Sequence, residues 1–210
     1  MMAYCISSQV GRSVANGILA GLFCAPLLSA HAWTITLDGA PRRVFLQVGN
    51  GSLNTNNALV NLVRVDVPGD QLGNGTMQQM TSSSTQSTSP LDNFTVCSAP
   101  VQVYVGGSYQ RNNSNSPATA LLQVTSPANL TSAAGDVIPF TQISWTTSTL
   151  RNDATPNVIP AGAFTGGTQT LTTISANTYV ENCHTFSYAN SALRAAGTYN
   201  GRVTYTLSTP

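Results

Sequence analysis

Apolar and polar residues alternate along much of the chain, in short runs separated by Gly, Pro and Asp. This period of two is typical of β-strands that bury one face. It occurs in the segments 33–37, 43–49, 58–67, 119–126, 138–147, 168–175, 179–188 and 199–207. A further segment, 94–109, reads as two short strands broken at Pro100. Because no amphipathic stretch is long enough for a packed helix, we expect an all-β sandwich of about nine or ten strands.

Two segments depart from this pattern. Residues 73–90, GNGTMQQMTSSSTQSTSP, have no period and little apolar content, so the sequence predicts a flexible Ser/Thr-rich surface loop. Residues 189–197, ANSALRAAG, have room for one helical turn and no more.

The first 32 residues have the features of a secretory signal peptide. Arg12 is their only charge, an apolar run extends from Ile18 to Leu28, and Ala30-His31-Ala32 forms a small-residue cleavage pattern. The alternative is an N-terminal membrane anchor, but the apolar run is shorter than the ~20 residues that a bilayer requires. We therefore expect cleavage before Trp33, and one secreted domain over residues 33–210.

The charge content narrows the range of partners. The chain has eight basic residues, all of them arginine, and seven acidic residues, with Glu181 as the only glutamate. Thr, Ser, Asn and Gln supply most of the remaining polarity. This composition offers neither a basic patch for nucleic acid nor a polybasic segment for anionic lipid, and beyond the leader it predicts no membrane span.

Two cysteines remain after the leader, Cys97 and Cys183. In an oxidising compartment, an isolated pair most simply forms a disulfide. The alternatives are two buried thiols or a metal site that includes His184, although two cysteines and one histidine do not complete a zinc shell.

The sequence carries no recognisable catalytic pattern. His184 adjoins Cys183, but neighbouring residues on a strand point to opposite faces, so the two side chains are not expected to act together. The acidic residues are scattered and mostly adjoin turns. We therefore expect no enzyme activity, cofactor or metal. Aromatic residues such as Trp145 and Tyr104 fit either a sugar-binding groove or, more simply, the core.

The chain ends on AAGTYNGRVTYTLSTP, in which Tyr199, Gly201, Val203, Tyr205 and Leu207 share one side of an alternating strand. This segment resembles the closing segment of the spore coat protein U family and of archaic chaperone–usher pilus subunits. Those proteins end with a Gly-Thr-Tyr turn into such a strand. The segment GDVIPFTQISW, residues 135–145, is also similar in character to the mid-domain strands of these secreted subunits.

The resemblance implies an immunoglobulin-like sandwich that lacks one strand and receives it from a neighbour by β-augmentation. It implies a periplasmic chaperone, an outer-membrane usher and like subunits as partners, on the path from the periplasm to the surface of a Gram-negative bacterium. The strand 199–207 is then the pairing strand. Trp33, Ile35 and Leu37 alternate as a donor strand requires, but they fit the first strand of the chain's own sandwich nearly as well. Cys97 also stands later than the first cysteine of such subunits.

Two functional hypotheses follow. The first is a non-catalytic secreted subunit with a structural or adhesive role, assembled by donor-strand complementation. The second is a self-sufficient extracellular sandwich that binds a surface glycan through exposed aromatic residues.

Overall fold

The computed structural model describes residues 35–39, 41–53, 60–150 and 158–210, and the predicted signal peptide and Trp33 lie outside them. The strands are β1 (Ile35–Thr36), β2 (Arg43–Val48), β3 (Val63–Arg64), β4 (Gln78–Gln79), β5 (Thr81–Ser82), β6 (Val103–Gln110), β7 (Thr119–Thr125), β8 (Asn129–Ser132), β9 (Val137–Pro139), β10 (Ile143–Ser148), β11 (Gly162–Ala163), β12 (Thr168–Ser175), β13 (Thr178–Tyr188), β14 (Tyr199–Asn200) and β15 (Thr204–Ser208). Two 3-10 turns, η1 (Gly69–Gln71) and η2 (Phe140–Gln142), complete the regular structure. The expected all-β fold is confirmed.

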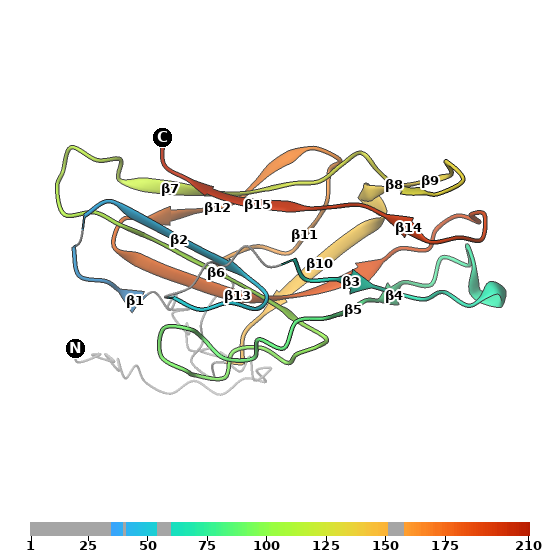
Figure 1. The fold of residues 1–210 in the computed structure, drawn as a ribbon, viewed down its shortest axis with the longest axis horizontal. Helices are drawn as coiled ribbons and strands as arrows, with labels where there is room; N and C mark the ends of the chain where they lie inside the picture. The colour runs from blue at the N-terminus through green and yellow to red at the C-terminus, as the bar shows by residue number, and fades with distance from the viewer. Residues whose placement is uncertain (1–34, 40, 54–59, 151–157) are drawn as a thin grey trace, which may run out of the picture.

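The strands form two facing layers (Figure 1). One layer is the sheet β11-β10-β13-β6-β2, in which all pairings are antiparallel. The other contains the sheet β12-β7-β15 and, further along the same direction, the small sheet β14-β8-β9. The short pair β3-β5 lies beside the first layer.

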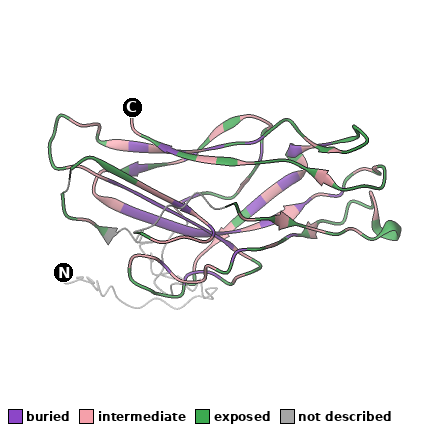
Figure 2. Ribbon diagram, in the orientation of Figure 1, coloured by how far each residue is buried: buried purple, intermediate pink, exposed green. Residues whose placement is uncertain are grey.

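The core lies between the layers, and its residues come from alternate positions of the strands (Figure 2). Leu122 and Val124 of β7 face Val103 and Val105 of β6 across it, and all four are fully or almost fully buried. The period-two reading of β7 is therefore correct. Strand β13 is buried on both faces over most of its length, which explains why its sequence alternates less cleanly.

The Ser/Thr-rich segment 73–90 is not the unstructured loop that its composition suggests. It contributes β4 and β5, and near its end Thr88 forms an isolated antiparallel bridge with Thr95. The side chains of Met80, Ser84 and Ser89 are buried. The side-chain oxygen of Asn50 accepts the backbone N–H of Thr85 at 2.8 Å. Hydroxyl groups and backbone bonds replace apolar contacts here, which is why hydropathy alone gave the wrong expectation.

The closing segment is also different from its expected form. It is two strands, with β14 paired to β8 and β15 paired to β7, and residues 201–203 belong to neither ladder. A Cβ atom on Gly201 would lie 2.6 Å from the ring of Phe140 and 2.7 Å from a methyl group of Leu130. Gly201 therefore marks the point where the chain crosses packed side chains and changes sheets.

Three other strand expectations need correction. In 58–67 only β3 is in a ladder, and 94–109 contains the single strand β6 rather than two strands. The run 138–147 is divided by η2 into β9 and β10. Residues 189–197 form an irregular loop without a helical turn.

Candidate functional site: a seam between two strand edges

Strands β2 and β15 are the edge strands of their sheets and lie on the same side of the sandwich (Figure 1). Among the described residues, β2 has only β6 as a ladder partner and β15 has only β7. Cα atoms of the two strands come within 8 Å of one another. The side chain of Arg42, just before β2, donates a hydrogen bond to the hydroxyl of Thr209, just after β15. We call this boundary between the layers the seam.

The β2 side of the seam continues beyond the end of β2. The side-chain amide of Asn61 donates to the carbonyl of Val48 at 2.9 Å, and its oxygen accepts the N–H of Asn50 at 3.4 Å. A Cβ atom on Gly49 would overlap the Asn61 side chain. Asn61 thus ties the end of β2 to the segment 61–67, which contains β3.

Both sides of the seam present apolar side chains at alternate positions. The ones on the β2 side are Val44, Leu46, Val48, Val63, Val65 and Val67, and the ones on the β15 side are Val203, Tyr205 and Leu207. Most of them pack against the core yet remain partly exposed, and Val44 is 51 % exposed. The seam is therefore an incompletely covered margin of the core.

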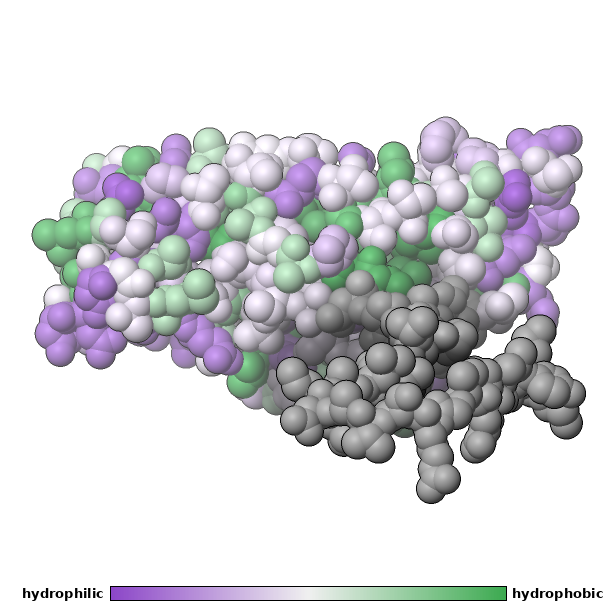
Figure 3. All heavy atoms as spheres, turned by 180° about the vertical axis from the view of Figure 1, so that it is seen from behind, coloured by the Kyte–Doolittle hydropathy of each residue, from purple (hydrophilic) through white to green (hydrophobic). Residues whose placement is uncertain are grey.

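The opposite side of the sandwich is built differently. Strand β12 forms the far edge of its sheet, and its ladder with β7 is interrupted by a bulge between Thr170 and Thr172. The far edge of the other sheet is β11, which has only two residues. Seen from this side, the surface is a mixture of hydrophilic residues and residues of intermediate hydropathy, and hydrophobic residues lie toward the middle (Figure 3). Bulges and short strands are common protection against edge pairing, whereas β2 and β15 have regular ladders.

The structure divides the predicted pairing strand between three places. Tyr205 and Leu207 lie on β15 at the seam, and Val203 lies just before it. Tyr199 lies on β14, and Gly201 is in the exposed break between the two strands.

The predicted donor segment pairs with its own chain in this structure. Ile35 and Thr36 form β1, which is antiparallel to Tyr179 and Thr178 at the start of β13. The N–H of Leu37 donates to the carbonyl of Asn177 at 2.8 Å. Its ladder is thus two residues long.

Cys97 and Cys183 form the expected disulfide, with their Cα atoms 5.5 Å apart. The bridge lies on the outer face of the first layer and packs with Val96 and Tyr104 in a second, smaller core. It therefore ties the segment that follows residues 73–90 to β13.

A buried polar network adjoins this second core. The hydroxyl of Tyr104 lies 2.5 Å from that of Tyr179 and donates to the carboxylate of Glu181 at 2.7 Å. Burial, followed by the proximity of Tyr179 and Glu181, raises the pKa of Tyr104 well above its usual value. Burial likewise raises the pKa of Tyr179. Both phenols therefore stay protonated and act as hydrogen-bonding groups that link β6 to β13.

His184 lies on the other face of β13, inside the main core. Its ring stacks on Trp145 with 6.0 Å between centroids and lies 6.4 Å from the ring of Tyr205. The side chain is completely buried, and neither ring nitrogen has a hydrogen-bond partner among the described residues. Burial lowers its pKa to about 3. His184 and Cys183 thus occupy opposite faces of β13.

The described part of the chain contains no group of three or more His, Cys, Asp or Glu side chains placed to hold a metal ion. Within the same residues, no helix has the length and apolar character needed to cross a membrane.

Sequence reasoning identified half of the seam. It singled out Tyr205 and Leu207 but left out β2 and Asn61, which form the opposite side. The alternation of 43–49 followed by that of 58–67 was the available signal, because two successive strands of the same phase can belong to one interrupted edge.

Comparisons of the chain with protein-family models, with curated proteins and with solved structures found no match to any of them.

Proposed function

We propose that the protein is a secreted, non-catalytic structural subunit that accepts a β-strand from a like chain along the seam. The observation that supports this proposal is a difference between the two sides of the sandwich. The far edge strands, β12 and β11, are bulged or short, whereas the seam strands β2 and β15 have regular ladders. β15 has no charge, proline or bulge in its five residues. Such an edge offers free backbone groups to another strand.

The seam side chains are suited to specific strand pairing. An incoming strand exposes alternate side chains toward the core, and those would meet the partly covered apolar residues on both sides of the seam. Backbone hydrogen bonds would supply affinity, and the side-chain positions would fix the register.

Strand uptake would require the seam to widen. One intervening strand places its two neighbours about 9.6 Å apart, at about 4.8 Å per spacing. Because Cα atoms of β2 and β15 already come within 8 Å, β15 must move outward. The break at 201–203 is a natural pivot, since these residues are held by no ladder.

The proposed donor is the N-terminal segment of another copy, with Trp33, Ile35 and Leu37 as its apolar positions. In this structure β1 has a ladder of two residues, so releasing it from its own β13 would disrupt little regular pairing. A periplasmic chaperone would occupy the seam before assembly, and an outer-membrane usher would order the subunits.

A charge on the seam tests this function. Val44 is half exposed, so Val44→Lys should change the free energy of unfolding by less than about 0.5 kcal/mol. An inward-pointing charge on an edge is nevertheless a strong obstacle to pairing. Val101→Lys is a matched control, because Val101 is 37 % exposed and lies outside the seam.

The measurement is the mass in solution of the chain starting at Trp33, by light scattering over a concentration series. The wild type and Val101→Lys should form oligomers, and Val44→Lys should stay monomeric. A wild type that is monomeric at every concentration, or a Val44→Lys variant that associates like the wild type, would contradict the proposal.

A further inference from the structure

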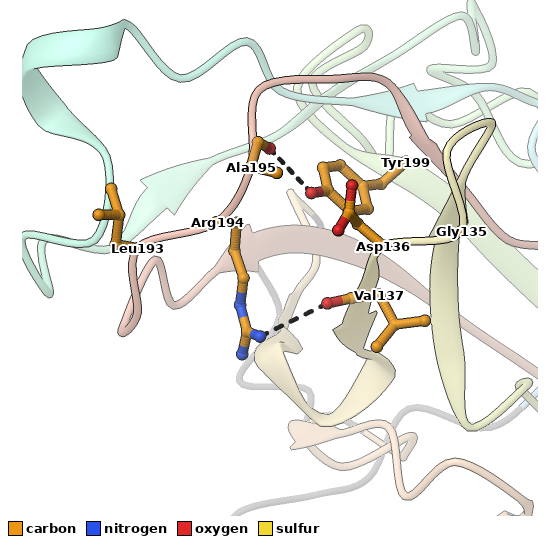
Figure 4. Close-up of a pocket in the computed structure, with 7 residues that line it drawn as sticks. All are labelled: Gly135, Asp136, Val137, Leu193, Arg194, Ala195 and Tyr199. Carbon is orange, nitrogen blue, oxygen red and sulfur yellow. Dashed lines mark hydrogen bonds between the residues drawn. The ribbon is translucent and has the colours of Figure 1, made fainter.

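A shallow depression of about 380 Å³ lies beside the β8–β9 hairpin and β14 (Figure 4). These strands are at one end of the sandwich (Figure 1). The lining of the depression comes from the β8–β9 hairpin, from the loop between β13 and β14, and from β14 itself. These residues are Gly135, Asp136, Val137, Leu193, Arg194 and Tyr199, together with Ala195.

The hairpin holds the backbone of Asp136 in place. The N–H of Ser132 donates to the carbonyl of Asp136 at 2.9 Å, and the N–H of Asp136 donates to the Ser132 hydroxyl at 3.1 Å. Gly135 has a φ of +91°, a conformation that favours glycine and lets the turn close. The Asp136 side chain therefore projects from a turn whose backbone is well bonded.

The other two polar groups are also oriented. The hydroxyl of Tyr199 donates to the carbonyl of Ala195 at 2.8 Å, which fixes the phenol ring beside the depression. The guanidinium of Arg194 donates to the carbonyl of Val137 at 3.5 Å, which brings it to the rim opposite Asp136 (Figure 4).

Asp136 and Arg194 line one depression without forming an ion pair with each other (Figure 4). The guanidinium contacts a carbonyl, and Asp136 is an exposed residue. The depression therefore offers a negatively charged acceptor, the Asp136 carboxylate, on one side and a positively charged donor, the Arg194 guanidinium, on the other. Leu193, 76 % exposed, adds an apolar surface beside them.

We propose that this depression binds a single neutral sugar residue of a glycan. A hydroxyl group both donates and accepts, so neighbouring hydroxyls can donate to the Asp136 carboxylate while others accept from Arg194. The Tyr199 ring and Leu193 offer apolar surface to the face of a sugar ring. The volume is at the small end of the range for ligand pockets, about 300–1,000 Å³, which fits one ring rather than an extended chain.

The depression contains one acidic and one basic side chain, Asp136 and Arg194, and this pair favours a neutral ligand. An acidic sugar would pair with Arg194 but would bring a second carboxylate toward Asp136, and a cationic ligand would face the reverse conflict. A neutral polyhydroxylated ring satisfies both groups. This site is independent of strand uptake at the seam, so either proposal can fail without the other.

The test is a titration of the ¹⁵N-labelled chain starting at Trp33 with the methyl glycosides of glucose, galactose, mannose and N-acetylglucosamine. Binding of at least one glycoside should shift the amide signals of Gly135, Val137 and Arg194 in a saturable manner. Asp136→Asn and Arg194→Gln should each weaken that binding at least tenfold, because each removes one charged hydrogen-bonding group. Asp92→Asn, which changes another exposed acid outside both the depression and the seam, should leave it unchanged.

The unperturbed amide spectrum of each variant shows that it is folded. The proposal is overturned if none of the four glycosides shifts these signals, or if Asp136→Asn and Arg194→Gln bind as well as the wild type. It is also overturned if the zwitterion glycylglycine binds there more tightly than every glycoside, because the site then belongs to a peptide-like ligand.

Discussion

Acid should destabilise this fold through one side chain, His184. Its imidazole is completely buried against Trp145, Phe186 and Tyr205, none of which carries a charge to stabilise the protonated ring. Burial lowers its pKa to about 3 from an ordinary value of 6.5. At mildly acidic pH, His184 therefore binds a proton in the unfolded chain but stays neutral in the folded chain. The contribution of His184 to the free energy of unfolding is therefore fully present above pH 6.5 and decreases as the pH falls toward 3.

The size of the effect follows from the two pKa values. Each pH unit between them is worth about 1.4 kcal/mol, so the loss from pH 7 to about pH 4.5 is on the order of 2.5 kcal/mol. The matched variant is His184→Phe, which keeps an aromatic ring between Trp145 and Tyr205 but does not titrate. At pH 7 it should be as stable as the wild type or more so, because two unpaired buried nitrogens are removed.

The assay is urea unfolding of both proteins at the two pH values, followed by tryptophan fluorescence, since Trp145 stacks directly on the histidine. All carboxylates are common to both proteins, so the difference between their pH dependences isolates His184. The two proteins should differ by about 2.5 kcal/mol in the stability lost on acidification. Equal losses would refute the reasoning, because they would mean that the imidazole is hydrated or paired in solution.

Three further predictions concern the Ser/Thr-rich segment, the disulfide and the packing at Gly201. Deleting Ser82–Ser89 should lower the melting temperature by on the order of 5–10 °C in a thermal scan, because buried hydroxyl groups and the cover of the second core are lost; an unchanged value would show that the segment is dispensable. Cys97→Ala should cost about 2–5 kcal/mol in urea unfolding, and the unreduced wild type should take up no alkylating label on Cys97 or Cys183. Gly201→Ala should cost about 1–3 kcal/mol in the same assay, because its Cβ would overlap packed side chains, whereas Gly167→Ala meets nothing within 4 Å and should be neutral.

The sequence was most informative where a strand buries one face only. The boundaries of β7 follow the alternation almost residue by residue, because Ala120, Leu122 and Val124 are buried and the positions between them are partly exposed. The Cys97–Cys183 disulfide was also predictable, since residues 33–210 contain one possible pair.

Prediction from sequence failed where tertiary contacts decide the outcome. Nothing local indicates that Gly201 ends a ladder, because the reason is the approach of Phe140 from a distant part of the chain. The Ser/Thr-rich segment is held by Asn50 and by the backbone, and such bonds leave no hydropathy signal. The seam required knowing that β2 and β15 become the edges of two sheets on one side, which is a property of the topology.

Hydrogen exchange of backbone amides tests the central proposal, strand uptake at the seam, most directly. The chain lacking residues 33–38 is mixed with a synthetic peptide of that sequence, WTITLD, and exchange is compared with and without the peptide. Strand uptake should give new protection along both β2 and β15, since both edges gain a partner, and unchanged exchange in β12. Protection confined to the start of β13, where β1 lies in this structure, or no change in β2 and β15, would contradict it.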